Sequence, residues 1–177
     1  MATRGLLPAL CFTFLLTFIV FPALVQDTNF RFLAGTKSEE SWFVLSTLTL
    51  FNLFDTLGRM SASLTFMKLS RRMTLLANYC RTFFLATFLL VAFEAGPAWL
   101  FTSDWFKVLN MVLFAFTNGW LSSLCVIITP EHVKQSERGE IGALINPTIV
   151  GGILIGSILA IPLEQVLKLT PKHMLQA

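Results

Sequence analysis

The sequence contains little charge. Asp, Glu, Lys and Arg together make up 13 % of its 177 residues, whereas soluble domains contain about 25 %. Hydrophobic residues make up 55 %, with 18 phenylalanines among them, and the mean hydropathy is +0.72. So few charged side chains cannot cover the water-exposed surface of a protein of this size. The composition therefore predicts an integral membrane protein that contacts the lipid bilayer.

Residues that commonly build metal sites and reactive centres are also scarce. The three cysteines lie in apolar runs without a CxxC pair, and the two histidines are far apart, at His132 and His173. This pattern argues against a disulfide framework and against a zinc site. Because no nucleophile–base pair stands out either, we expect neither an enzyme nor a cofactor. The net charge of +3 is small and scattered, which argues against nucleic-acid binding.

Long apolar runs dominate the chain. Five are long enough for a membrane-spanning helix, which takes about 20 residues, and they cover residues 5–25, 41–67, 73–93, 105–129 and 141–163. Because the polar loops between them are short, we expect a single all-α membrane domain over residues 1–177. A cleaved signal peptide is an alternative for the first run, which follows Arg4. Its apolar length and the lack of an A-x-A site argue against cleavage.

The loops between the runs predict an orientation. The loop MKLSRR carries Lys68, Arg71 and Arg72 without an acidic residue, and short positive loops stay in the cytoplasm. We therefore expect a cytoplasmic N-terminus and a C-terminus outside. Lys168 and Lys172, near the C-terminus, oppose this assignment.

Two opposite charges interrupt the second run, in the stretch FNLFDTLGRM. Asp55 and Arg59 are one helical turn apart, and Asn52, Thr56 and Ser63 fall in the same sector, about 100° wide. At the centre of a membrane helix, Asp and Arg each cost about 2.5–3.5 kcal/mol, so these two residues must be paired or hydrated within a bundle. Two interpretations remain open. The residues form a structural ion pair, or they border a polar cavity that receives a hydrophilic substrate.

Further polar residues occur in the third and fourth runs. Arg81 shares a helical face with Asn78, and its side chain either extends to the membrane surface or forms a gate contact. Asn118 and Ser122 share a face of the fourth run. Hydrogen bonds between helices and the lining of a cavity are both compatible with these two residues.

Small residues predict where helices pack closely. Gly119 allows a neighbouring helix to approach the fourth run. In the fifth run, Gly152, Gly156 and Ala160 recur every four residues. Such small-xxx-small ridges are typical of helix contacts in membranes.

Several stretches together resemble one known family. FNLFDTLGR, then FAFTNGWLSSL, then PEHVK leading to GEIGALI are similar, in order and spacing, to the C-terminal half of equilibrative nucleoside transporters. The likeness extends over residues 6–167, nearly the whole chain. In that family an F-N-x-x-D-x-x-G-R motif marks the eighth of eleven helices.

The resemblance implies a fold and a function. The expected fold is the five-helix C-terminal half of an arrangement similar to the major facilitator superfamily, in which six helices and then five enclose a central site. The expected activity is facilitated diffusion of nucleosides, or of nucleobases, by alternating access. The resemblance further implies that Asp55 and Arg59 contact the sugar of the substrate and that Asn52 lines the cavity. A carboxylate acceptor beside a guanidinium donor suits ribose hydroxyls.

The first six helices of the family pattern are missing. We therefore expect this chain to be a C-terminal half or fragment of a transporter, with a missing N-terminal half as its partner. The alternative is a non-transporting membrane protein that associates with a full-length relative. The expected location is the plasma membrane.

Overall fold

A computed structural model describes residues 5–21, 39–93 and 103–169. Within these residues the regular elements are all helices. They are α1 Leu6–Val20, α3 Glu39–Ser61, α4 Arg71–Cys80, α5 Thr82–Ala92, α7 Asp104–Glu131 and α8 Arg138–Leu169, with short 3-10 turns η2 Thr65–Met67 and η3 Gln135–Glu137.

Three of the described segments are long and apolar enough to cross a membrane. They are Arg71–Ala92, Asp104–Glu131 and Gln135–Leu167. The first of these segments consists of α4 and α5 together. Helix α1 is apolar but has only 15 residues. Helix α3 has 23 residues, and its polar residues, including Asp55 and Arg59, lower its hydropathy. Within the described residues the protein is thus all-helical, with three helical segments of membrane-spanning length and composition.

The helix bounds differ from the predicted runs in several places, and α8, for example, extends beyond residue 163 to Leu169. Helix α3 ends at Ser61, well before residue 67, and the chain then turns through η2. The third run holds two helices, since α4 and α5 are joined at Arg81. Helix α1 ends at Val20, and residues 22–25 of the first run lie outside the described residues.

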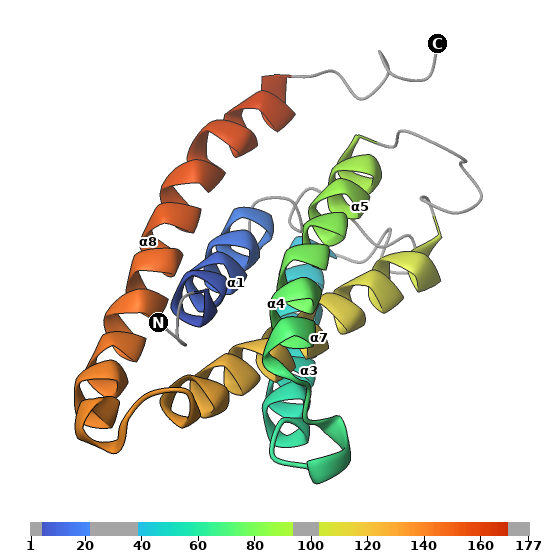
Figure 1. Cartoon of the computed structure of the whole chain (residues 1–177). Helices are drawn as coiled ribbons and strands as arrows, with labels where there is room; N and C mark the ends of the chain where they lie inside the picture. Colours follow the sequence, from blue (N-terminus) through green and yellow to red (C-terminus); the bar gives the residue numbers. More distant parts are fainter. Residues whose placement is uncertain (1–4, 22–38, 94–102, 170–177) are drawn as a thin grey trace.

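The main helix contacts form two pairs, α3 with α7 and α1 with α8, which meet where α1 packs on α7. Figure 1 shows α4 and α5 running end to end, with α8 along one edge of the molecule. Helix α3 packs mainly on α7, while α1 packs on both α8 and α7. One apolar cluster includes Leu10 and Leu124, and a second includes Phe88 and Phe114. The contact between α1 and α7 therefore lies at the centre of the described bundle.

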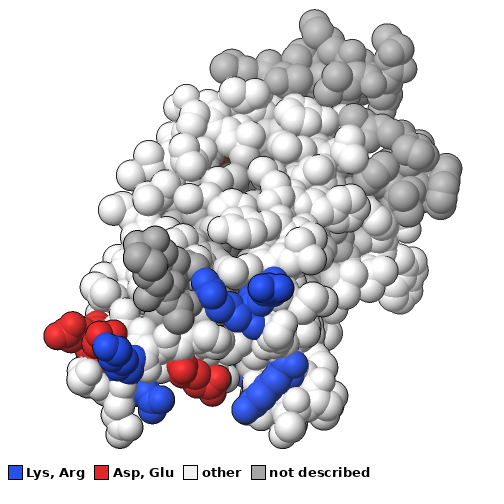
Figure 2. Space-filling model, viewed as in Figure 1, with Lys and Arg blue, Asp and Glu red and all other residues white. Residues whose placement is uncertain are grey.

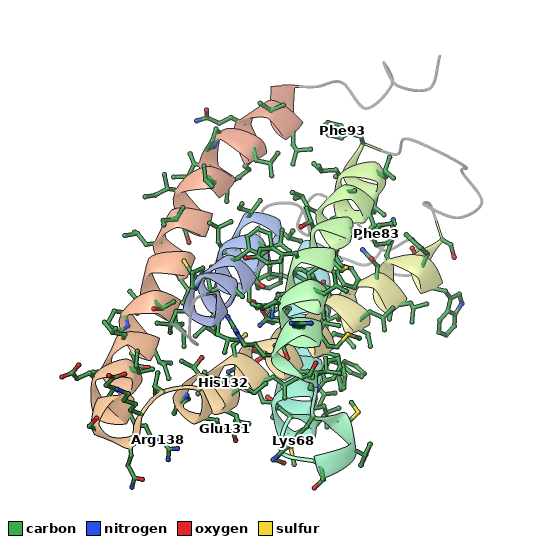
Figure 3. All side chains as sticks on the ribbon, viewed as in Figure 1. Lys68, Phe83, Phe93, Glu131, His132 and Arg138 are labelled. Carbon is green, nitrogen blue, oxygen red and sulfur yellow. The ribbon has the colours of Figure 1, made fainter. Side chains whose placement is uncertain are left out.

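Charged side chains gather at one end of the visible face (Figure 2). This end holds η2, the start of α4, the end of α7 and the start of α8, and Figure 3 labels Lys68, Glu131, His132 and Arg138 there. Phe93 lies towards the opposite end. The remainder of the visible face is almost entirely uncharged, as expected for a surface in contact with lipid.

Candidate functional site

An ion pair lies on α3. Arg59 Nε donates a hydrogen bond to Asp55 Oδ2 at 2.7 Å, the one-turn spacing that a helix brings together. The two side chains differ in exposure, at 46 % for Arg59 and 13 % for Asp55. The carboxylate is thus largely enclosed, while the guanidinium reaches the surface of the described helices.

The second carboxylate oxygen of Asp55 accepts a hydrogen bond from a residue of α7. Asn118 Nδ2 donates to Asp55 Oδ1 at 2.7 Å. The close approach depends on two glycines, because a β-carbon on Gly119 would collide with the Asp55 carbonyl and one on Gly58 would collide with the Phe116 carbonyl. Both oxygens of Asp55 therefore have a donor, which a buried carboxylate requires.

Two further residues continue this network from Asn118. Thr17 Oγ1, on α1, lies 2.7 Å from Asn118 Oδ1, and Arg81 Nη2 donates to Thr17 Oγ1 at 3.2 Å. Arg81, Thr17, Asn118 and Asp55 form a continuous hydrogen-bonded chain, which we call the Asp55 relay. It joins α1, α3, α7 and the junction of α4 and α5.

The guanidinium of Arg81 is enclosed. The residue is only 2 % exposed. Its side chain therefore does not extend to the surface of the described helices, as one of the two alternatives from the sequence had proposed. Nη1 donates to the Thr13 carbonyl at 3.3 Å, and Nη2 also donates to the Phe114 carbonyl at 3.4 Å. The guanidinium carbon lies 4.9 Å from the centroid of the Phe114 ring, within range of a cation–π contact.

A neighbouring branch joins α1 to α4. Thr13 Oγ1 donates to Asn78 Oδ1, and Asn78 Nδ2 donates to the Thr74 carbonyl at 3.0 Å and to Cys125 Sγ at 3.5 Å. All four residues are buried. This branch provides hydrogen-bond partners for the Asn78 amide of α4, and none of its hydrogen bonds goes to Asp55.

The remaining polar residues selected from the sequence lie apart from the relay. Asn52 is exposed, and its amide donates to the Leu48 carbonyl of its own helix at 2.9 Å. Ser122 is buried and donates to the Gly119 carbonyl at 3.2 Å, also within its own helix. The hydrogen bonds of both side chains thus go to their own helices and not to the ion pair.

The small residues of α8 face α1. A β-carbon on Gly152 would collide with the Cys11 carbonyl, and one on Gly156 would collide with the Leu15 carbonyl. Ala160, one turn further, is buried. This contact surface is apolar and separate from the relay.

Sequence reasoning missed three residues that the site uses. Thr13 and Thr17 are one turn apart in a run that is otherwise apolar, and this pairing was the signal that could have identified them. Gly58 lies within the FNLFDTLGR stretch, between the two charges. Its position opposite α7 became visible only in the packed structure.

Among the described residues, no group of three or more His, Cys, Asp or Glu side chains could hold a metal ion. The side chains of the site can form hydrogen bonds and charge–charge interactions. A carboxylate, a guanidinium and an amide are buried between helices, and a second guanidinium lies beside them at the surface, an arrangement typical of membrane proteins that handle polar solutes.

Comparison with known proteins assigns the family. The sequence profile of the family described as "Nucleoside transporter" matches residues 5–165. The chain therefore belongs to the nucleoside transporter family, which is a family of membrane transporters and not of enzymes.

Individual relatives agree with this assignment. Equilibrative nucleoside transporter 1 of Homo sapiens is 32 % identical over 156 residues, covering 85 % of this chain and 34 % of the relative. Nucleoside transporter 1.2 of Leishmania donovani is 28 % identical, covering 86 % and 30 %, and adenosine transporter 1 of Crithidia fasciculata is 27 % identical, covering 85 % and 29 %. The chain spans about a third of the length of these curated relatives.

Proposed function

We propose that this chain is the C-terminal half of a carrier that moves nucleosides across a membrane by facilitated diffusion with alternating access. Membership of the nucleoside transporter family supports the substrate class. The observation that carries the proposal is the Asp55–Arg59 pair, in which both carboxylate oxygens accept a hydrogen bond while the Arg59 side chain remains 46 % exposed.

The geometry of this pair suits a sugar. A ribose hydroxyl both donates and accepts, so it can donate to an oxygen of Asp55 and accept from Arg59. Asn52 lies one turn before Thr56 on the same exposed side of α3 and adds a further amide. We propose that Asn52, Asp55 and Arg59 contact the substrate, and that the exposed side of α3 borders the transport cavity together with the remainder of the carrier.

The distribution of charge supports an orientation. Basic residues at the charged end of the bundle outnumber acidic ones, with Lys68, Arg71, Arg72, Lys134 and Arg138 against Glu131, Glu137 and Glu140. Such an excess in short loops favours the cytoplasmic side. We propose that this end is cytoplasmic, that the chain begins inside and ends outside, and that the carrier resides in the plasma membrane.

Uptake of radiolabelled adenosine and uridine tests the proposal. The full chain is coexpressed with the part of human equilibrative nucleoside transporter 1 that lies outside the matched region. We expect uptake that depends on both polypeptides and that falls at least tenfold, or roughly 1.4 kcal/mol, in Asp55→Asn and Arg59→Leu. Asp104→Asn is the matched control. It neutralises an acid that lies on α7, not on α3, and pairs with Lys107 of the same helix at 4.0 Å.

Two results would count against this function. Uptake that survives in both α3 variants would leave the ion pair with a structural role alone. An inactive combination, together with copurification of the chain with a full-length relative, would favour a non-transporting subunit.

A further inference from the structure

We propose that Arg81 is a positioning residue that fixes the acceptor geometry of Asp55 through Thr17 and Asn118. This inference rests on the proposed function, because it adds a residue to the same site. Arg81 comes from the junction of α4 and α5 and has no direct hydrogen bond to Asp55 among the described residues. Any hydrogen-bonded influence of Arg81 on Asp55 must therefore pass through side chains of α1 and α7.

The chemistry at the two ends sets the direction of every bond in the relay. A guanidinium has only donors, and an ionised carboxylate has only acceptors. Asn118 must therefore turn its NH₂ group towards Asp55, which leaves its Oδ1 facing Thr17. Thr17 then accepts from Arg81 and donates its single hydroxyl proton to Asn118. Each link thus donates towards the carboxylate.

Arg81 also removes a competitor for the Thr17 proton. The Thr13 carbonyl lies 2.8 Å from Thr17 Oγ1, in the one-turn geometry by which threonine commonly bonds its own helix. Arg81 Nη1 donates to this same carbonyl at 3.3 Å. Because the Thr13 carbonyl also accepts from Arg81, it attracts the Thr17 proton less strongly, and the hydroxyl is more available to Asn118. Without Arg81, the hydroxyl would turn to Thr13, and Asn118 Oδ1 would lose its donor.

The charges around Asp55 divide into two roles. Two charged groups that act on Asp55 are Arg59 on its own helix and Arg81 at the α4–α5 junction. Helices α1 and α7 contribute the neutral groups of Thr17 and Asn118. Arg81 is 2 % exposed and serves as a buried counter-charge. Arg59, at the surface, is left to meet the substrate.

Thr17→Val tests the relay by removing the bridging hydroxyl, and Thr17→Ser restores it. Thr13→Val is the matched control, because it removes a buried hydroxyl one turn away on α1 that bonds Asn78 and not the relay. In the coexpression uptake assay, we expect Thr17→Val to raise the KM for adenosine about tenfold at unchanged amounts of carrier. Thr17→Ser and Thr13→Val should keep the KM within about twofold of the unsubstituted chain on the same scale.

A second measurement does not depend on transport. The side-chain amide of Asn118 is followed by nitrogen-15 NMR in the purified full chain in detergent micelles. We expect its protection from hydrogen exchange to fall in Thr17→Val and Arg81→Gln and to remain in Thr13→Val. Arg81→Lys keeps the charge but has no planar fork of donors, so we expect only partial protection.

The outcomes separate the two proposals. An Asn118 amide that is unchanged in Thr17→Val would overturn the relay, whatever the uptake assay shows. Equal increases of KM in Thr17→Val and Thr13→Val would overturn it as well. If the unsubstituted chain supports no uptake, the proposed function fails, and the NMR measurement alone decides whether Arg81 positions Asp55.

Discussion

Two helix crossings in this molecule use the same packing device and differ in their chemistry. Helix α3 meets α7 at Gly58 and Gly119, and α8 meets α1 at Gly152 and Gly156. In each crossing a backbone carbonyl of one helix occupies the space that a side chain would take on the other. Small residues at such positions are the usual means by which membrane helices approach closely.

The surroundings of the two crossings separate packing from function. The α1–α8 crossing is bordered by apolar side chains, such as Phe14 and Phe18, and needs no ionised group to bring the helices together. The α3–α7 crossing carries Asp55 and Asn118 directly beside Gly119. Because close packing does not require charge, the buried carboxylate needs another explanation. This contrast supports a role for Asp55 in handling the substrate.

The largest effect on stability is expected at the α3–α7 crossing. Gly119→Ala places a β-carbon against the Asp55 carbonyl and the Arg59 amide, so the helices must separate and the Asp55–Asn118 bond must lengthen. We expect the free energy of unfolding to fall by roughly 2–3 kcal/mol, measured by helicity in titrations with a denaturing detergent. Gly142→Ala is the control, because its β-carbon has open space. Equal stability of the two variants would contradict this packing.

A smaller loss of unfolding free energy is expected when the hydrogen bond between Asn118 and Asp55 is removed without pushing the two helices apart. Asn118→Leu keeps the size of the side chain but leaves Asp55 Oδ1 and Thr17 Oγ1 without their shared partner. We expect a loss of about 1.5–3 kcal/mol, the range for hydrogen bonds to charged groups. The exposed Asn146→Leu on α8 serves as the control in the same titration. An Asn118→Leu variant as stable as this control would show that the crossing tolerates Asp55 Oδ1 without its donor from α7.

The apolar crossing should be more tolerant. Gly152→Ala directs a β-carbon at the Cys11 carbonyl, but α8 packs mainly on α1 and can shift outwards, whereas α7 is enclosed by several helices. We expect a loss of about 1–2 kcal/mol, with the Asn118 amide signal unchanged. A change in that signal would mean that the two crossings are coupled through α1.

The sequence predicted the contacts that lie within one helix. The one-turn spacing of Asp55 and Arg59 made an ion pair one of the expected arrangements, and Arg59 Nε lies 2.7 Å from Asp55 Oδ2. Spacing alone could not assign Asn118 and Thr17 as neighbours of Asp55, because 63 residues separate Asn118 from Asp55 and 101 separate it from Thr17. Such contacts depend on which helices are adjacent and on their rotation.

The end of α3 shows a second limit. The sequence after Ser61 continues with Ala62, Leu64 and Phe66, without a proline or glycine to end the helix. Hydrophobicity therefore predicted a helix to residue 67, whereas the chain turns after Ser61. In the packed structure, the Trp120 indole of α7 donates to the Met67 carbonyl of the following turn at 3.1 Å. A long-range contact at the turn thus overrides local hydrophobicity.

The smallest effect should have the opposite sign. Gly151 is next to Gly152 on α8, but a β-carbon there would meet no atom within 4 Å apart from its own helix and chain neighbours. Alanine is favoured over glycine within a helix by about 0.5–1 kcal/mol, because it restricts the unfolded backbone. We therefore expect Gly151→Ala to raise the free energy of unfolding by that amount, measured beside Gly152→Ala in the same detergent titration. Opposite signs at adjacent positions would locate the contact surface of α8 to within one residue, since only the side that faces α1 lacks room for a methyl group. Destabilisation by Gly151→Ala would instead mean that α8 is rotated about its axis relative to α1.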